Sequence, residues 1–226
     1  METNRSTVYF FSFLLAFCSL FYELVYAHIL SVCVGGTKTQ YLLIISLFTC
    51  ALGIGSLLQH KLAERFTLRR LFFAVELSLT VLGSLGPFLI AWVLQVEPEP
   101  AALTTAKLAL SYFLVFLIGL LSGFEIPCLF ALAPEAHGKV LGFDYAGMLA
   151  ASILFPFLFL PVLGTASSTL VIAALNLHAL IWLLPASASK RVKLVLHGAT
   201  FVLICALVGL RSPLNEVLSS LYLGGI

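Results

Sequence analysis

Four acidic residues stand inside long apolar stretches of the sequence: Glu23, Glu76, Glu125 and Asp144. Placing an ionisable side chain among apolar neighbours in a bilayer costs about 2.5–3.5 kcal/mol on insertion scales, so each of these acids needs a reason. A carboxylate in such a place can bind a cation, carry a proton or pair with a buried donor. The alternative is a hydrogen-bonded carboxyl group with a structural role alone.

The neighbours of two of these acids favour ligand binding. Glu23 lies in FYELVYAHIL, where Tyr22 and His28 add polar groups close in sequence. Glu125 lies in SGFEIPCL, where Pro127 removes a backbone donor and favours a kinked helix. Many transporters build a site near the bilayer midplane from a broken helix beside charged groups. We therefore predict a ligand-binding set for a polyamine or another cation, made of Tyr22, Glu23, His28, Glu125 and Asp144.

The other two acids have competing interpretations. Asp144 stands in LGFDYAGML at the start of an apolar segment, so it can also be an N-terminal carboxylate favoured by the helix dipole. Glu76 follows Arg69 and Arg70 closely, and a surface acid reaching toward the membrane interface is favoured there. Whether Glu76, Glu125 and Asp144 converge is a question that helix packing decides.

No catalytic or metal-binding constellation is visible in the sequence. The five cysteines contain no CxxC pair and favour small core residues over disulfides or zinc ligands. The histidines at 60, 137, 178 and 197 lack metal-ligand spacing. No phosphate loop, GxSxG or HExxH motif occurs, and ALGIGSLL is typical of close helix packing. We predict no catalytic residue, no metal and no cofactor for this chain.

The composition predicts an all-α bundle of transmembrane helices. The 226 residues are 61% hydrophobic and 10% charged, with a mean hydropathy of +1.11, whereas soluble domains carry roughly 25% charged residues. The N-terminal apolar stretch runs past Glu23 without a convincing cleavage site, so it is a retained helix. Breaks at charges, Pro and Gly delimit seven apolar segments, at 8–34, 41–58, 71–93, 108–130, 144–163, 168–184 and 194–210.

The loop charges predict an orientation. With seven spans, nine of the twelve basic residues fall on one side and Lys38, Lys107 and Arg211 on the other. The positive-inside rule then places the N-terminus in the cytoplasm and the C-terminus outside, in a bacterial inner membrane. The basic residues are too few and too scattered for a nucleic-acid surface.

A weak internal similarity links the two halves of the chain. SLFYELVYAHIL (19–30) and SGFEIPCLFAL (122–132) both place an aromatic residue before Glu and an aliphatic one after it. The offset is about 100 residues, or three helices, which would give two halves of opposite direction. This is either an inverted repeat of three helices, as transporters often have, or a chance similarity.

Several motifs together resemble a known family. FCSLFYELVYAHILSVCVGG, ALGIGSLLQHKLAER, GFEIPCLFAL and VLGFDYAGMLAASILFPFLFLPVLG resemble the N-terminal membrane region of membrane-bound spermidine synthases (polyamine aminopropyltransferases). The matching elements include Tyr22-Glu23, Glu125 with Pro127, and Asp144 with Gly147. Family members commonly carry Arg where this chain has His28, so an ion pair with Glu23 would depend on pH here.

The resemblance implies two parts. Residues 1–210 form a transmembrane domain, and 211–226, with LNEVLSSLYLGGI, resemble the lead-in to a soluble catalytic domain. No glycine-rich loop or acidic catalytic motif follows, so no catalytic residue can be carried over. The chain is either truncated there or a stand-alone membrane domain. Seven spans would also place an appended synthase outside, away from a cytoplasmic substrate.

Three functions compete on this evidence. The first is a membrane domain that anchors or serves a catalytic partner and binds a polyamine or other cation. The second is a small cation- or proton-coupled transporter. The third is a structural subunit of a larger membrane complex. The expected partners are the lipid bilayer, a cationic ligand and a catalytic or other membrane protein, with no nucleic acid.

Overall fold

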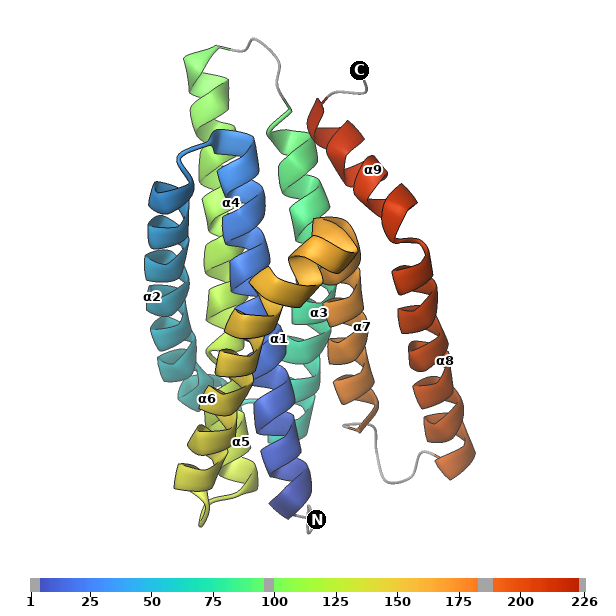
Figure 1. Cartoon of the computed structure of the whole chain (residues 1–226). Coiled ribbons are helices and arrows are strands. Elements are labelled where there is room, and N and C mark those ends of the chain that lie inside the picture. The colour runs from blue at the N-terminus through green and yellow to red at the C-terminus, as the bar shows by residue number, and fades with distance from the viewer. Residues whose placement is uncertain (1–4, 96–99, 183–188, 224–226) are drawn as a thin grey trace.

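The computed structural model describes residues 5–95, 100–182 and 189–223, and these residues form helices and short links with no strand (Figure 1). The first four helices are α1 (Arg5–Val34), α2 (Thr37–Ala63), α3 (Leu68–Val93) and α4 (Ala101–Ser122). They are followed by α5 (Glu125–Leu132), α6 (His137–Leu154), the π-helical turn η1 (Phe155–Leu163), α7 (Gly164–Trp182), α8 (Lys190–Gly209) and α9 (Arg211–Leu223). The predicted all-α bundle is confirmed.

Six helical stretches of the described residues are long and apolar enough to cross a membrane. One of them, His137–Ile181, contains α6, η1 and α7. Its two arms run in opposite directions in Figure 1, so it supplies two legs of the bundle. Pro156 and Pro161 interrupt regular helical hydrogen bonding in η1, and Gly164 takes a φ of 76°, which permits the reversal. Each of the seven apolar segments expected from sequence therefore corresponds to one helical stretch that runs along the bundle.

Helix α1 forms the centre of the bundle. Phe21, Val25 and Leu30 are fully buried on it, and it packs most extensively against α6. The other extensive pair is α2 with α4. By contrast, α2 and α8 expose many large apolar side chains, among them Leu57, Leu194 and Phe201. Those faces suit contact with lipid tails, because a soluble surface of this kind would be costly.

Glycines let the central helices approach closely. A Cβ at Gly55 of α2 would overlap the carbonyl oxygen of Leu120 on α4, and one at Gly123 would overlap that of Leu52. Between α1 and α6, a Cβ at Gly147 would overlap the Phe13 carbonyl oxygen. Backbone contact through small residues is a common mode of helix association in membranes.

The packing has the pattern that an inverted repeat produces. Exchanging α1 with α4, α2 with α6 and α3 with α7 turns the α1–α6 pair into the α4–α2 pair. It also turns the α1–α7 pair into the α4–α3 pair and leaves α3–α7 unchanged. The pattern departs at two places. The counterpart of α1–α2 is made by the short α5 with α6, and α1–α3 has no comparably extensive α4–α7 counterpart. The correspondence is therefore partial, and the inverted repeat stays a prediction.

The segment after residue 210 packs on the bundle as α9. Asn215 donates a hydrogen bond to the Leu163 carbonyl oxygen at 2.6 Å and accepts one from the Ala166 amide at 3.0 Å. Leu218 is buried, and α9 contacts both α7 and α3. Asn215 therefore holds the reversal after η1 in place, and α9 packs against the bundle.

Basic side chains gather at one end of the bundle. The N-terminal end of α1, the α2–α3 link and the start of α8 lie together there (Figure 1). At this end Arg5 forms an ion pair of 2.9 Å with Glu135, which lies in the α5–α6 link. We refer to it below as the basic end.

Candidate ligand-binding site

One face of α1 lines a small cavity in the bundle. Ser19 and Leu20 each lie three or four residues from both Ala16 and Glu23, so the four side chains share a face of the helix. The cavity has a volume of about 40 Å³. Glu23 is 6% exposed and is therefore held inside the protein.

The second carboxylate comes from a break in a helix. Glu125 is the first residue of α5, which is separated from α4 by Gly123 and Phe124. Pro127 has no N–H to donate to the Gly123 carbonyl one turn earlier, which accounts for a break at this place. The expected broken helix beside a carboxylate is therefore observed, and Glu125 reaches the cavity from it.

The third carboxylate is Asp144, which lines the cavity together with Met148 on α6. The alternative reading of Asp144 as a helix N-terminal residue is wrong, because α6 begins at His137. Asp144 thus lies about two turns inside the helix and is buried. Basic and polar residues of HGKV continue the helix toward the basic end, so hydropathy alone placed the start too late.

The cavity therefore collects carboxylates from three helices. Among the described side chains, no Lys, Arg or His lines it; the remaining lining residues are Phe48, Leu52, Ser122 and Ile126. Glu125 lies close enough to Asp144 for the two charges to interact. Among the described residues, no ion pair or hydrogen bond satisfies these three carboxylates. Buried polar groups normally have a partner, so an acidic cavity of this kind is suited to a cation.

Glu76 lies next to this cavity and is fully buried, so its interpretation as a surface acid is wrong. It lies on α3 close enough to Glu125 for their charges to interact. Both of its carboxylate oxygens lack a hydrogen-bond partner in the described structure. The nearby Asn176 of α7 donates to the backbone carbonyl oxygen of Glu76 at 3.3 Å and to Thr80 Oγ1 at 3.2 Å. Glu76, Glu125 and Asp144 thus form one acidic cluster.

Two residues of the predicted set do not line the cavity. The ring of Tyr22 packs against Gly83 of α3, and its buried hydroxyl group has no hydrogen-bond partner. That hydroxyl lies near Glu76 and Glu125, on the side of α1 that faces α3. His28 lies farther along α1, with its ring centroid 6.3 Å from that of Phe155. The structure therefore brings together Glu23, Glu125 and Asp144, and it leaves His28 apart.

The chain is similar in sequence to several known proteins. It is 30% identical over 213 residues to a polyamine aminopropyltransferase of Leptospira interrogans, covering 90% of this chain and 41% of that protein. It is 31% identical over 179 residues to polyamine aminopropyltransferase 2 of Ralstonia nicotianae, covering 76% of this chain and 34% of that protein. The chain is spermidine synthase-like.

The family resemblance expected from sequence is confirmed for a part of these proteins. A polyamine aminopropyltransferase of Oceanobacillus iheyensis is 29% identical over 177 residues, covering 75% of this chain and 33% of that protein. The spermidine synthase-like chain thus spans about two fifths or less of the length of these relatives. No protein-family model matches the chain, and no solved structure matches it.

Sequence reasoning missed several polar residues of this spermidine synthase-like bundle. Ser122 Oγ and Asn176 Oδ1 are buried without hydrogen-bond partners. Gln59 is buried and donates to Cys128 Sγ at 3.8 Å. Asn176, in the apolar stretch VIAALNLHAL, carried the available signal, because an amide in a membrane helix needs a partner just as an acid does.

A second polar contact joins α7 and α8. His178 Nδ1 lies 3.2 Å from His197 Nδ1 and 2.9 Å from Thr200 Oγ1. The sequence separates these histidines by 19 residues and gave no reason to pair them. In the described part of the chain, no group of three or more His, Cys, Asp or Glu side chains is placed to hold a metal ion.

Proposed function

We propose that this chain is a membrane domain of a spermidine synthase-like protein and binds an amine cation at the cavity formed by Glu23, Glu125 and Asp144. One observation carries the proposal. Carboxylates from three different helices line one cavity, and none of the lining residues that the structure describes is basic. The names of the relatives point to polyamine chemistry for those proteins. A protonated amine is the cation that links the two observations.

The size of the cavity limits which part of the ligand it holds. About 10–15 Å³ is enough for one water molecule, so about 40 Å³ accommodates an ammonium group but not a whole polyamine. An alkylammonium group has three N–H donors, so it can contact more than one of the carboxylates that line the cavity. The bound group would therefore be one end of a polyamine, and the rest of the molecule would need a path that opens between helices.

The proposal extends to the setting of the domain. It would lie in a bacterial inner membrane with the basic end toward the cytoplasm, following the positive-inside rule. There it would anchor or serve a catalytic partner that uses the same class of cation. The cavity formed by Glu23, Glu125 and Asp144 would hold the amine close to such a partner.

Calorimetric titration of the detergent-solubilised chain with spermidine tests the cation site. Saturable binding is expected for the unmodified protein and for Glu216→Gln, which removes an exposed acid of α9. Glu23→Gln and Glu125→Gln should each weaken binding by at least about tenfold, since removing one partner of a buried charged contact costs 2–5 kcal/mol. Equal affinity in all four proteins, or no binding to any, would reject the cation site.

A second candidate is a cation- or proton-coupled carrier. The break between α4 and α5 and the exchangeable packing of the two halves favour it, because transporters combine both features. Spermidine uptake into proteoliposomes under an imposed pH or voltage gradient distinguishes the candidates. Uptake that is lost in Glu125→Gln would favour a carrier. Binding without uptake would favour a domain that serves a partner. The absence of both binding and uptake would favour a structural subunit.

A further inference from the structure

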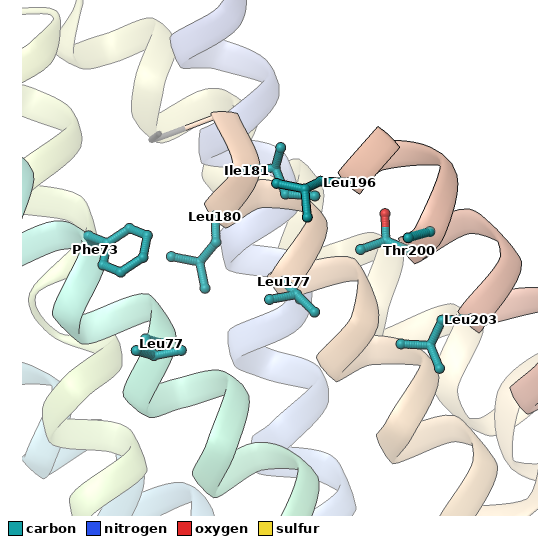
Figure 2. Close-up of a pocket in the computed structure, with 9 residues that line it drawn as sticks. Phe73, Leu77, Leu177, Leu180, Ile181, Leu196, Thr200 and Leu203 are labelled. Atoms are coloured by element: carbon teal, nitrogen blue, oxygen red, sulfur yellow. The ribbon is translucent and has the colours of Figure 1, made fainter. Parts of the chain in front are cut away.

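A groove lined by apolar side chains runs along the outside of the bundle between α3, α7 and α8. Its volume is about 300 Å³. Phe73 and Leu77 line it from α3, Leu177 and Leu180 from α7, and Leu196 and Leu203 from α8 (Figure 2). Helix α8 packs mainly against α7, which leaves the space beside α3 open.

The described wall of the groove offers little polar chemistry to a ligand. Among the lining residues that the structure describes, Thr200 alone is polar. Its hydroxyl donates to the His197 carbonyl oxygen at 2.9 Å and contacts His178 Nδ1 at 2.9 Å. The wall is thus apolar in its chemistry, so it suits a hydrocarbon chain better than a polar metabolite or an amine.

Basic residues continue the same helix faces beyond one end of the groove. Arg69 and Arg70 precede Phe73 by four and three residues, so they lie one turn farther along the face of α3 that lines the groove. Lys193 precedes Leu196 by three residues on α8, with the same consequence. Phe73 and Leu196 lie toward the same end of the groove, away from Leu77 and Leu203 (Figure 2).

These basic residues belong to the basic end of the bundle, where the membrane interface would lie. The starts of α3 and α8 meet this end together (Figure 1). Arg70 is exposed, whereas Arg69 and Lys193 are half-buried. Residues 64–70 contain one acidic residue, Glu64, and three basic ones, Arg65, Arg69 and Arg70, so this stretch has a net positive charge.

We propose that the groove is a binding site for an anionic phospholipid. One acyl chain would lie along the leucine-lined wall, and the phosphate would contact Arg69, Arg70 and Lys193. Arginine side chains bind phosphate oxygens in pairs, and basic pockets between membrane helices recognise anionic head groups. This site is separate from the cavity of Glu23, Glu125 and Asp144, and it does not depend on amine binding.

Native mass spectrometry of the detergent-solubilised chain tests the head-group part of the proposal. With equimolar phosphatidylglycerol and phosphatidylcholine, the unmodified chain should retain phosphatidylglycerol with a preference on the order of tenfold. The double variant Arg69→Gln/Arg70→Gln should lose most of this preference. Lys38→Gln/Arg211→Gln, which removes two exposed cations at the other end, should keep it. Equal retention of both lipids by the unmodified chain would overturn the proposal without any variant.

A second pair of variants tests the acyl-chain part. Ala199→Phe fills the groove, because Ala199 lines it. Cys205→Phe places the same side chain on an exposed position of α8 that does not line it. Phosphatidylglycerol retention should fall at least about fivefold in the first and stay unchanged in the second. Equal retention in both would show that the lipid binds elsewhere and would overturn the assignment to this groove.

Discussion

Two tyrosines one turn apart on α1 differ in one respect that can be measured. Both pack against glycines of α3, Tyr22 against Gly83 and Tyr26 against Gly86. Tyr26 donates its hydroxyl to the Leu82 carbonyl oxygen at 2.8 Å, whereas the Tyr22 hydroxyl is buried without a partner. The two hydroxyl groups therefore contribute differently to stability, although their rings contribute alike.

Tyr26→Phe should lower the free energy of unfolding by about 1 kcal/mol, because it removes the hydrogen bond between the hydroxyl group on α1 and the Leu82 carbonyl oxygen on α3. That corresponds to a fall of about 2–4 °C in the thermal midpoint for a chain of this size. Tyr22→Phe should leave the midpoint unchanged or raise it. Differential scanning fluorimetry in detergent measures both, and a larger loss in Tyr22→Phe would contradict the described placement of the hydroxyl groups.

The burial of Glu76 should lower the stability of the protein, and a functional role would explain why the residue is there. Its side chain is fully buried, and both carboxylate oxygens lack hydrogen-bond partners. Removing such a group often stabilises a protein, because the cost of burying it disappears. Sequence reasoning placed Glu76 on the surface because Arg69 and Arg70 stand nearby, but Glu76 lies about two turns deeper along α3 than Arg69, where the helix is buried.

Glu76→Met should therefore raise the thermal midpoint by at least about 2 °C, the change expected for roughly 1 kcal/mol. Glu216→Met, at an exposed position of α9, is the matched control and should have little effect. Thermal unfolding of both variants in the same detergent compares them. A lower midpoint for Glu76→Met would mean that the carboxylate has a stabilising partner in the membrane.

At the scale of the elements, periodicity and helix-breaking residues carried most of the predictable information. Apolar length located the legs of the bundle, and Pro127 indicated the break that separates α4 from α5. The position of the break and the start of α6 were not predictable in detail, because they depend on contacts between helices. The pairing of His178 with His197 is also a tertiary feature, set by the packing of α7 against α8.

The sequence ALGIGSLL gives a matched test of helix packing. Gly55 faces α4 so closely that a Cβ would overlap the Leu120 carbonyl oxygen, while a Cβ at Gly53 would meet nothing within 4 Å. Gly53→Ala should therefore be neutral or stabilise the helix by up to about 1 kcal/mol. Gly55→Ala should destabilise by about 1–3 kcal/mol, as other overpacked substitutions do. Thermal midpoints separate the two, and an equal effect would argue against the α2–α4 contact.

For the whole molecule, the composition was sufficient to predict an all-α bundle with helices apolar enough to span a membrane. The order of the motifs was sufficient to predict the family resemblance. The cavity was partly predictable, because Glu23, Glu125 and Asp144 stood out as acids in apolar surroundings. The exclusion of Tyr22 and His28 from its lining was not, since it depends on which side of α1 faces α2 and α6. A helical face can be read from spacing, but the neighbour it meets is decided by the packing of all the helices.

The loop charges predict the orientation of the whole bundle in the membrane, with the basic end in the cytoplasm. The α2–α3 link and the C-terminal end of α9 lie toward opposite ends of the bundle in Figure 1. The link contains Arg65 and this part of α9 contains Ser220, and both residues are exposed. In a variant whose five native cysteines are replaced by serine or alanine, a membrane-impermeant thiol reagent should label Ser220→Cys in intact cells. Arg65→Cys should react only after the membrane is permeabilised, because the positive-inside rule keeps the basic end in the cytoplasm. The reverse pattern would invert the bundle, and labelling of both positions from one side would mean that one of the legs does not cross the bilayer. The result also decides where a partner can approach α9, because a partner on the cytoplasmic side would have to dock at the basic end instead.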